Sequence, residues 1–194
     1  MHRHRSNAGS AAMEFAVSLP FLVIMTFGTF AIGAIIDRHL TVTQLVRHAG
    51  NMYGRGVDFT QTQNKQVLLQ AATGMNMTLT GGQGVIYLSM VVQSPPNGAG
   101  ENRPNANMPV VAHRVVIGNT TMANSTIAMP TGVASNGEVA NCYDDNLTAR
   151  ATLPPGLTLA QNERLYFAEV YHMPAELGFP GIFSPQMLYS RAVF

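Results

Sequence analysis

The chain has 194 residues, a formal net charge of +1, and only 11% charged residues, whereas soluble domains usually carry about 25%. This length suits one membrane helix plus one small globular domain and excludes two large domains. The near-neutral charge shows no bias toward nucleic acid, so no nucleic-acid partner is predicted.

Residues 1–9 form a short leader in which Arg3 and Arg5 are the formally charged residues. From Phe15 to Ile36 no residue is formally charged. These residues give about 33 Å of helix, enough for a hydrocarbon core of about 30 Å. Because the arginines precede the apolar run, the positive-inside rule predicts a cytoplasmic N-terminus. We therefore expect residues 10–36 to be a single transmembrane helix.

An ordinary secretory signal peptide fits this run less well. Its apolar part would be about 7–15 residues long and would end in a small-residue cleavage site. Here the run is longer, and its far end, Ala34-Ile35-Ile36-Asp37, lacks such a site. The better position for cleavage precedes the run, after Gly9.

Glu14 is a carboxylate at the edge of the apolar run, where a charge is costly and usually has a partner. If the bond between Gly9 and Ser10 is cut, Glu14 becomes the fifth residue of the mature chain. The new α-amino group of Ser10 on a neighbouring subunit would then pair with this carboxylate and favour the correct register between packed helices. The alternative is that Glu14 lies in the headgroup region of a signal anchor.

Gly9 followed by Ser-Ala-Ala-Met-Glu-Phe resembles the type IV prepilin processing motif, which is a glycine, four residues, a glutamate and an aromatic residue. The residues at these positions are Gly9 and Ser10 for processing, and Glu14 and Phe15 for assembly. The longer string, which continues Ala-Val-Ser-Leu-Pro-Phe-Leu and includes Pro20, is similar to the start of the TadE-like pseudopilins. These are minor subunits of tight-adherence (Tad/Flp) pilus systems. The likeness covers residues 6–55 and, less closely, residues 160–194.

The resemblance implies that a prepilin peptidase cuts after Gly9 and that the mature chain stays in the bacterial inner membrane until assembly. Its C-terminal domain would lie in the periplasm, and the subunit could enter the surface pilus. Major subunits of this pilus type are much shorter, so a minor subunit that starts, adapts or regulates the pilus is implied. TadE-like, TadF-like and TadG-like roles stay open. The expected partners are the peptidase, other pilin and pseudopilin subunits, the inner-membrane assembly platform and membrane lipid.

The helix is expected to continue past the membrane. Apolar residues recur at three- and four-residue steps beyond the span; they are Val42, Leu45, Val46, Ala49, Met52 and Tyr53. One helix would thus run from about Ala11 to about Tyr53, with residues 37–56 as its extramembrane continuation, ended by Gly54-Arg55-Gly56. Pro20 removes one backbone hydrogen bond, and a kink there is expected.

Residues 57–194 are expected to form a head domain of the α+β class, in which a small antiparallel sheet packs on the extramembrane half of the first helix. A short helix is predicted near residues 63–74. Period-two alternation predicts four strands, at residues 85–92, 110–117, 164–172 and 187–194. Loops rich in Asn, Gly, Pro and Ser cover residues 94–108 and 118–150, and one short strand is expected within the second, around residues 125–129.

No metal site, cofactor or catalytic residue is predicted. His113 and His172 lie on separate predicted strands, without the paired spacing of zinc ligands. Asp144-Asp145-Asn146 lacks the remaining positions of a calcium loop and reads as a polar turn. The lone cysteine, Cys142, is expected to pack or to lie in a loop. No local nucleophile motif such as G-x-S-x-G is present, so the chain is not expected to be an enzyme.

A second hypothesis keeps the membrane anchor but changes the role. The chain would be a signal-anchored extracytoplasmic binding or adhesion module, with its ligand surface on the loops at residues 94–108 and 118–150. The processing motif favours the pilus subunit, because a plain anchor needs neither Gly9 nor Glu14.

Overall fold

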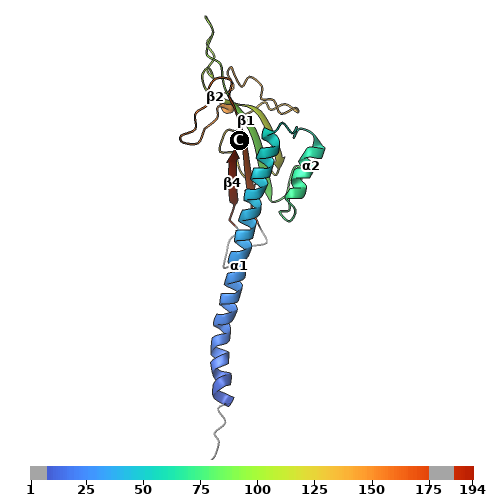
Figure 1. Cartoon of the computed structure of the whole chain (residues 1–194), viewed down its shortest axis with the longest axis vertical. Helices are drawn as coiled ribbons and strands as arrows, with labels where there is room; N and C mark the ends of the chain where they lie inside the picture. The colour runs from blue at the N-terminus through green and yellow to red at the C-terminus, as the bar shows by residue number, and fades with distance from the viewer. Residues whose placement is uncertain (1–7, 175–185) are drawn as a thin grey trace, which may run out of the picture. The chain divides into compact units, whose positions relative to one another are not determined.

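The computed structural model describes residues 8–174 and 186–194. The chain forms two compact units, residues 1–38 and residues 39–194. The elements in chain order are α1 (Ala8–Gly54), α2 (Thr62–Ala71), β1 (Gly84–Gln93), β2 (Pro109–Gly118), the 3-10 turn η1 (Leu147–Ala149), β3 (Arg164–His172) and β4 (Leu188–Val193) (Figure 1). A long N-terminal apolar helix followed by a sheet confirms the predicted α+β class.

The four strands form one antiparallel sheet in the order β2-β1-β3-β4. β1 is central, and its Leu88 lies opposite Val115 of β2 and Ala168 of β3. Between Met90 and Val91 the register with β2 shifts by one residue, which is a β-bulge. All four strands lie where the period-two alternation placed them.

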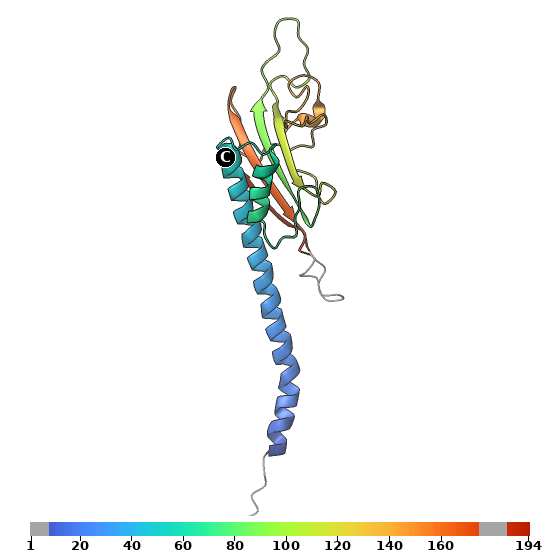
Figure 2. The same ribbon diagram turned by 90° about the vertical axis from the view of Figure 1, so that its right-hand side faces the viewer.

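The main core lies between the sheet and two helices, the part of α1 in the second unit and α2 (Figure 2). The α1 seam, which we define as Val42, Leu45, Val46, Ala49 and Tyr53, is buried. It packs against the sheet face that carries Ile86, Leu88, Val115, Ile117, Ala168 and Val170. Each fully buried aliphatic side chain of this size stabilises the fold by about 1.5–3 kcal/mol. The predicted continuation of the helix is therefore confirmed as part of the core.

The second helix is shorter than predicted. α2 ends at Ala71, and its buried row is Leu68 with Ala72 just beyond the end, whereas Val67 is 51% exposed. The amide of Ala72 still donates to Leu68 O at 3.2 Å, but Thr73 N already bonds Gln70 O in a tighter turn. The helix therefore closes before the predicted boundary near residue 74.

The strand expected around residues 125–129 is wrong, because these residues have no strand conformation. Other parts of the same excursion occupy the outer edge of β2 instead. Arg114 N donates to Gly137 O at 2.7 Å, and Val139 N donates to Ala112 O at 3.0 Å. Residues 125–129 instead bond side chains of the sheet, among them Glu169 and Arg114.

A contact between residues far apart in the chain closes the core beside α1. The backbone N and O of Phe194 pair with Tyr166 at 2.9 Å each. The Phe194 ring lies directly on Gly50 of α1, and a Cβ atom at Gly50 would come within 2.0 Å of the ring atom Cε2. A side chain at Gly50 would therefore have to displace the ring, which is 42% exposed.

Replacing Gly50 with alanine is expected to destabilise the head by about 1–3 kcal/mol, the usual cost of overpacking a core. The measurement is thermal or denaturant unfolding of the full chain in detergent. The matched control is Gly54→Ala, where the nearest atom to a new Cβ would be Phe194 Cβ at 3.5 Å. Equal midpoints for Gly50→Ala and the control would show that the ring does not need the glycine.

Candidate functional site

The predicted processing and assembly residues lie at the start of α1. The helix begins at Ala8, so Gly9 and Ser10 are in its first turn. Glu14 and Phe15 follow one turn later, and both side chains are exposed.

The apolar run is exposed all round the helix. The large apolar side chains of the first unit are each at least 42% exposed; they are Met13, Phe15, Val17, Leu19, Phe21, Leu22, Val23, Ile24, Met25, Phe27, Phe30, Ile32, Ile35 and Ile36. A helix that is apolar on every side is stable only when something other than water covers it. Lipid or other apolar helices are such covers.

Hydroxyl groups in the run are satisfied within the helix itself. Ser18 Oγ donates to Phe15 O at 3.2 Å, Thr26 Oγ1 to Leu22 O at 2.7 Å, and Thr29 Oγ1 to Met25 O at 2.9 Å. This matters because a bilayer core offers no water to an unpaired polar group. α1 also remains helical through Pro20, so the predicted kink does not interrupt the element.

The family model described as TadE-like protein matches residues 9–50. Over this segment the chain is similar to that family. The match contains Gly9, Ser10, Glu14, Phe15 and Pro20, so the family resemblance is confirmed where the motif lies. The matched segment stops inside α1, and the looser likeness at the far end of the chain remains a prediction. No match was found among curated proteins or among solved structures.

Within the described residues, α1 is the one helix long and apolar enough to cross a membrane. The matched segment, residues 9–50, covers most of this helix. Its length and composition are those of a membrane anchor.

In the second unit, a polar cluster lies on the sheet face opposite the helices. Glu169 of β3 is fully buried. Its Oε1 accepts from Thr126 N at 3.0 Å, from Thr126 Oγ1 at 2.5 Å and from Tyr189 OH at 3.2 Å. Its Oε2 accepts from the Ser125 hydroxyl. A buried carboxylate needs such donors, because burial otherwise penalises its charge.

Arg114 of β2 lies on the same face and is 3% exposed. Its Nη2 donates to Ala128 O at 2.6 Å, and its guanidinium carbon is 5.3 Å from the centre of the Tyr87 ring. Burial lowers the pKa of Arg114, and the nearby charge of Glu169 opposes that shift. Residues 125–128 thus lie between a buried carboxylate and a buried guanidinium.

The loops at one end of the sheet are tied together by Asn105, which is fully buried. Its Nδ2 donates to Cys142 O at 2.9 Å and to Asn146 O at 2.8 Å. Its Oδ1 accepts from Arg150 Nε at 2.8 Å. The two long loops are therefore one ordered surface. Cys142 is buried within it, as expected, and burial raises the pKa of its thiol.

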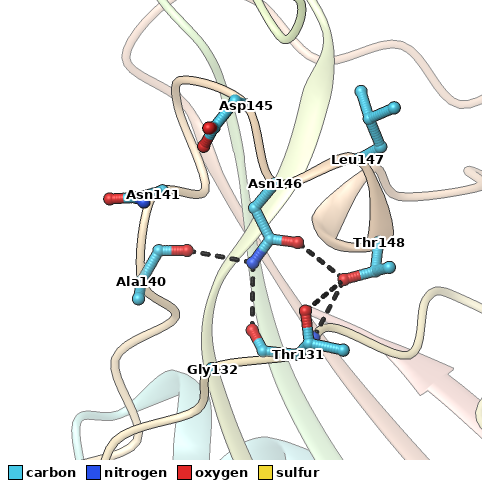
Figure 3. Close-up of a pocket in the computed structure, with 8 residues that line it drawn as sticks. All are labelled: Thr131, Gly132, Ala140, Asn141, Asp145, Asn146, Leu147 and Thr148. Atoms are coloured by element: carbon cyan, nitrogen blue, oxygen red, sulfur yellow. Dashed lines mark hydrogen bonds between the residues drawn. The ribbon is translucent and has the colours of Figure 1, made fainter.

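Asn146 organises a shallow hollow in the same region, shown in Figure 3. Its Nδ2 donates to Thr131 O and to Ala140 O, both at 2.9 Å, and its Oδ1 accepts from Thr148 Oγ1 at 2.6 Å. All the polar atoms of the side chain are thus used to hold the loop. The interpretation of Asp144-Asp145-Asn146 as a polar turn is confirmed.

The two strand histidines do not meet. His113 lies opposite Met90 of β1, whereas His172 lies opposite Gly84 at the other end of that strand. His113 Nε2 is 2.9 Å from Asn136 O, and its Nδ1 is 2.7 Å from Tyr53 OH. Because a carbonyl only accepts, Nε2 carries a proton and donates to Asn136 O. Among residues 8–174 and 186–194, no three His, Cys, Asp or Glu side chains gather as a metal site would.

Sequence reasoning missed Glu169, Asn105 and Asn146. The sequence did carry a signal for Glu169. Side chains two residues apart in a strand share a face, so Glu169 lies on the same face as the aromatic residues Phe167 and Tyr171. A face with two large apolar rings is expected to be covered, and the carboxylate would then be buried with them. The two asparagines had no such signal, because their partners come from loops whose path no periodicity describes.

Asn146→Asp is expected to destabilise the head by about 1–3 kcal/mol, because the carboxylate would face two carbonyls that lose their donors. Chemical denaturation of the full chain in detergent measures the change in unfolding free energy. Asn141→Asp is the matched control, because the Asn141 side chain is exposed at the rim of the same hollow. An Asn146→Asp protein as stable as the control would contradict the role of this amide.

Proposed function

We propose that this chain is a minor pilin-like (pseudopilin) structural subunit needed to assemble a tight-adherence type IV pilus, matured by prepilin peptidase cleavage after Gly9. The observation that carries the proposal is the TadE-like segment, which opens at Gly9 and holds Glu14 at the edge of an all-round apolar helix. The chemistry belongs to the peptidase, and this chain is proposed to be its substrate and not an enzyme.

The proposed location is the bacterial inner membrane, with a single pass. Arg3 and Arg5 precede the apolar run, which favours a cytoplasmic N-terminus and a periplasmic head. The proposed partners are the peptidase, other pilin and pseudopilin subunits, the assembly platform and the surrounding lipid. Exposure of the apolar run on every side supports this view, because lipid can cover it before assembly and helices can cover it afterwards.

Cleavage would give Glu14 its partner. The new α-amino group of Ser10 is a cation, and in a low-dielectric environment its pairing with a carboxylate is strong and specific. A pair formed between Ser10 of one subunit and Glu14 of the next fixes the axial register of the two helices. An uncleaved chain has an amide at this position and offers no such charge.

A binding or adhesion module is the second candidate function. The observation in its favour is the ordered surface formed by the two long loops, which Asn105 holds together. Such rigid loops on a sheet are a common location for binding sites. The two functions differ at the N-terminus, because an adhesion module on a plain anchor does not need cleavage at Gly9.

Co-expression with a prepilin peptidase is expected to yield a mature chain that begins at Ser10, as read by N-terminal sequencing or intact mass. Gly9→Ala is expected to abolish the cut, because the added methyl group alters the residue at the scissile bond. Ala8→Gly serves as the control that changes a neighbouring small residue. An intact Met1, or a cut beyond Ile36, would contradict the pilin function and favour the anchored module.

Glu14→Ala is expected to leave cleavage largely intact but to impair incorporation into the pilus, because the Ser10 amine loses its partner. The measurement is the amount of the subunit in sheared pili relative to the membrane fraction. Asp145→Ala removes an exposed carboxylate in the head and is expected to behave like the unmodified chain. Normal incorporation of the Glu14→Ala subunit would exclude the pairing.

A further inference from the structure

The polar cluster holds a segment that crosses the sheet. We define residues 119–129 as the strap. Each of the four strands contributes a side chain that bonds it; these are Tyr87 of β1 to Ala123 O at 2.7 Å, Arg114 of β2 to Ala128 O, Glu169 of β3 to Ser125 and Thr126, and Tyr189 of β4 to Thr126 Oγ1 at 3.1 Å. The strap makes no strand ladder. Two backbone hydrogen bonds to the rest of the head, Thr152 N to Ile127 O at 2.8 Å and Asn119 N to Gly84 O at 2.9 Å, add to these side-chain bonds.

The strap has little apolar anchoring. Ile127 is its one fully buried large apolar side chain, at 1% exposure. The strap lies between Gly118 and Gly132, whose φ angles of 106° and 70° are in the region that favours glycine. A segment with few buried apolar contacts and mostly side-chain hydrogen bonds belongs to the low-stability part of a fold.

The strap also shields two charged side chains from water. Glu169 and Arg114 are both buried, and each is hydrogen-bonded to the strap. Keeping charged groups away from water carries a large desolvation cost, and exposing them recovers it. Water can therefore replace the strap at both groups, which lowers the free energy needed to lift it.

The sheet does not depend on the strap for its main core. The α1 seam and α2 cover the opposite face, and none of the strap residues belongs to that cluster. Pairing between the strands is made by the backbone and is likewise independent of the strap. Lifting the strap would uncover the buried rings of Tyr87 and Tyr171, the second of which lies 4.7 Å, centroid to centroid, from the exposed ring of Tyr189.

We propose that the strap opens as a unit of its own while the four-stranded sheet stays folded. Glu169 acts as the latch, by which we mean that its hydrogen bonds to Ser125 and Thr126 hold the strap closed. The head then has a closed face and an open face that presents tyrosines and two opposite charges. This inference is independent of cleavage at Gly9 and of incorporation into a pilus.

Hydrogen–deuterium exchange of the full chain in detergent tests this proposal. The Thr126 and Ile127 amides are hydrogen-bonded in the closed state and report on the strap. We expect them to exchange faster than the amides of β1 and β3. In Glu169→Gln, which removes the charge that the donors face, strap exchange is expected to rise about tenfold while β1 and β3 stay protected.

Glu163→Gln, an exposed neighbour at the start of β3, is the control and should change neither region. The proposal is overturned if strap and sheet lose protection together, or if strap exchange does not respond to Glu169→Gln. Should that variant fail to fold, Thr126→Val removes one donor and leaves the carboxylate its others. It must raise strap exchange alone, and unchanged or global exchange in it equally overturns the latch.

Discussion

The head domain depends on the dry contact between the α1 seam and one face of the sheet. A two-layer domain needs every element to bury an apolar side against another layer. Without the seam, Ile86, Leu88, Ala168 and Val170 would face water on a sheet too small to protect them. α1 thus serves two environments in one element. Its first part is apolar on all sides, and its second part is apolar only where the sheet lies.

The elements that the sequence predicted well are those in which periodicity reflects one buried side. The steps of three and four from Val42 to Tyr53 predicted the helix face that the core uses. The alternation of Tyr166, Ala168 and Val170 predicted which side of β3 faces the helices. The apolar run and the glycine–glutamate spacing predicted the TadE-like segment, because both are local patterns that need no knowledge of the fold.

The parts that sequence reasoning missed are held by single polar residues that act over long distances in the chain. Residues 125–129 were expected to form a strand, yet they bond the Glu169 carboxylate and the Arg114 guanidinium, and their backbone forms no strand ladder. Asn105 and Asn146 hold loops through amide groups that any exposed asparagine also has. Their roles follow from where the loops run, and this path is set by the whole fold.

The contact of Phe194 with Gly50 also constrains how the chain reaches its native state. Gly50 of α1 is synthesised early, but Phe194, whose ring lies on it, is the last residue of the chain. Contacts between such distant residues form slowly, because a long loop must close before they contribute. During synthesis this part of α1 therefore stays uncovered until nearly the whole head has been made. Shielding of this face during that interval would affect the yield of the protein more than its final stability.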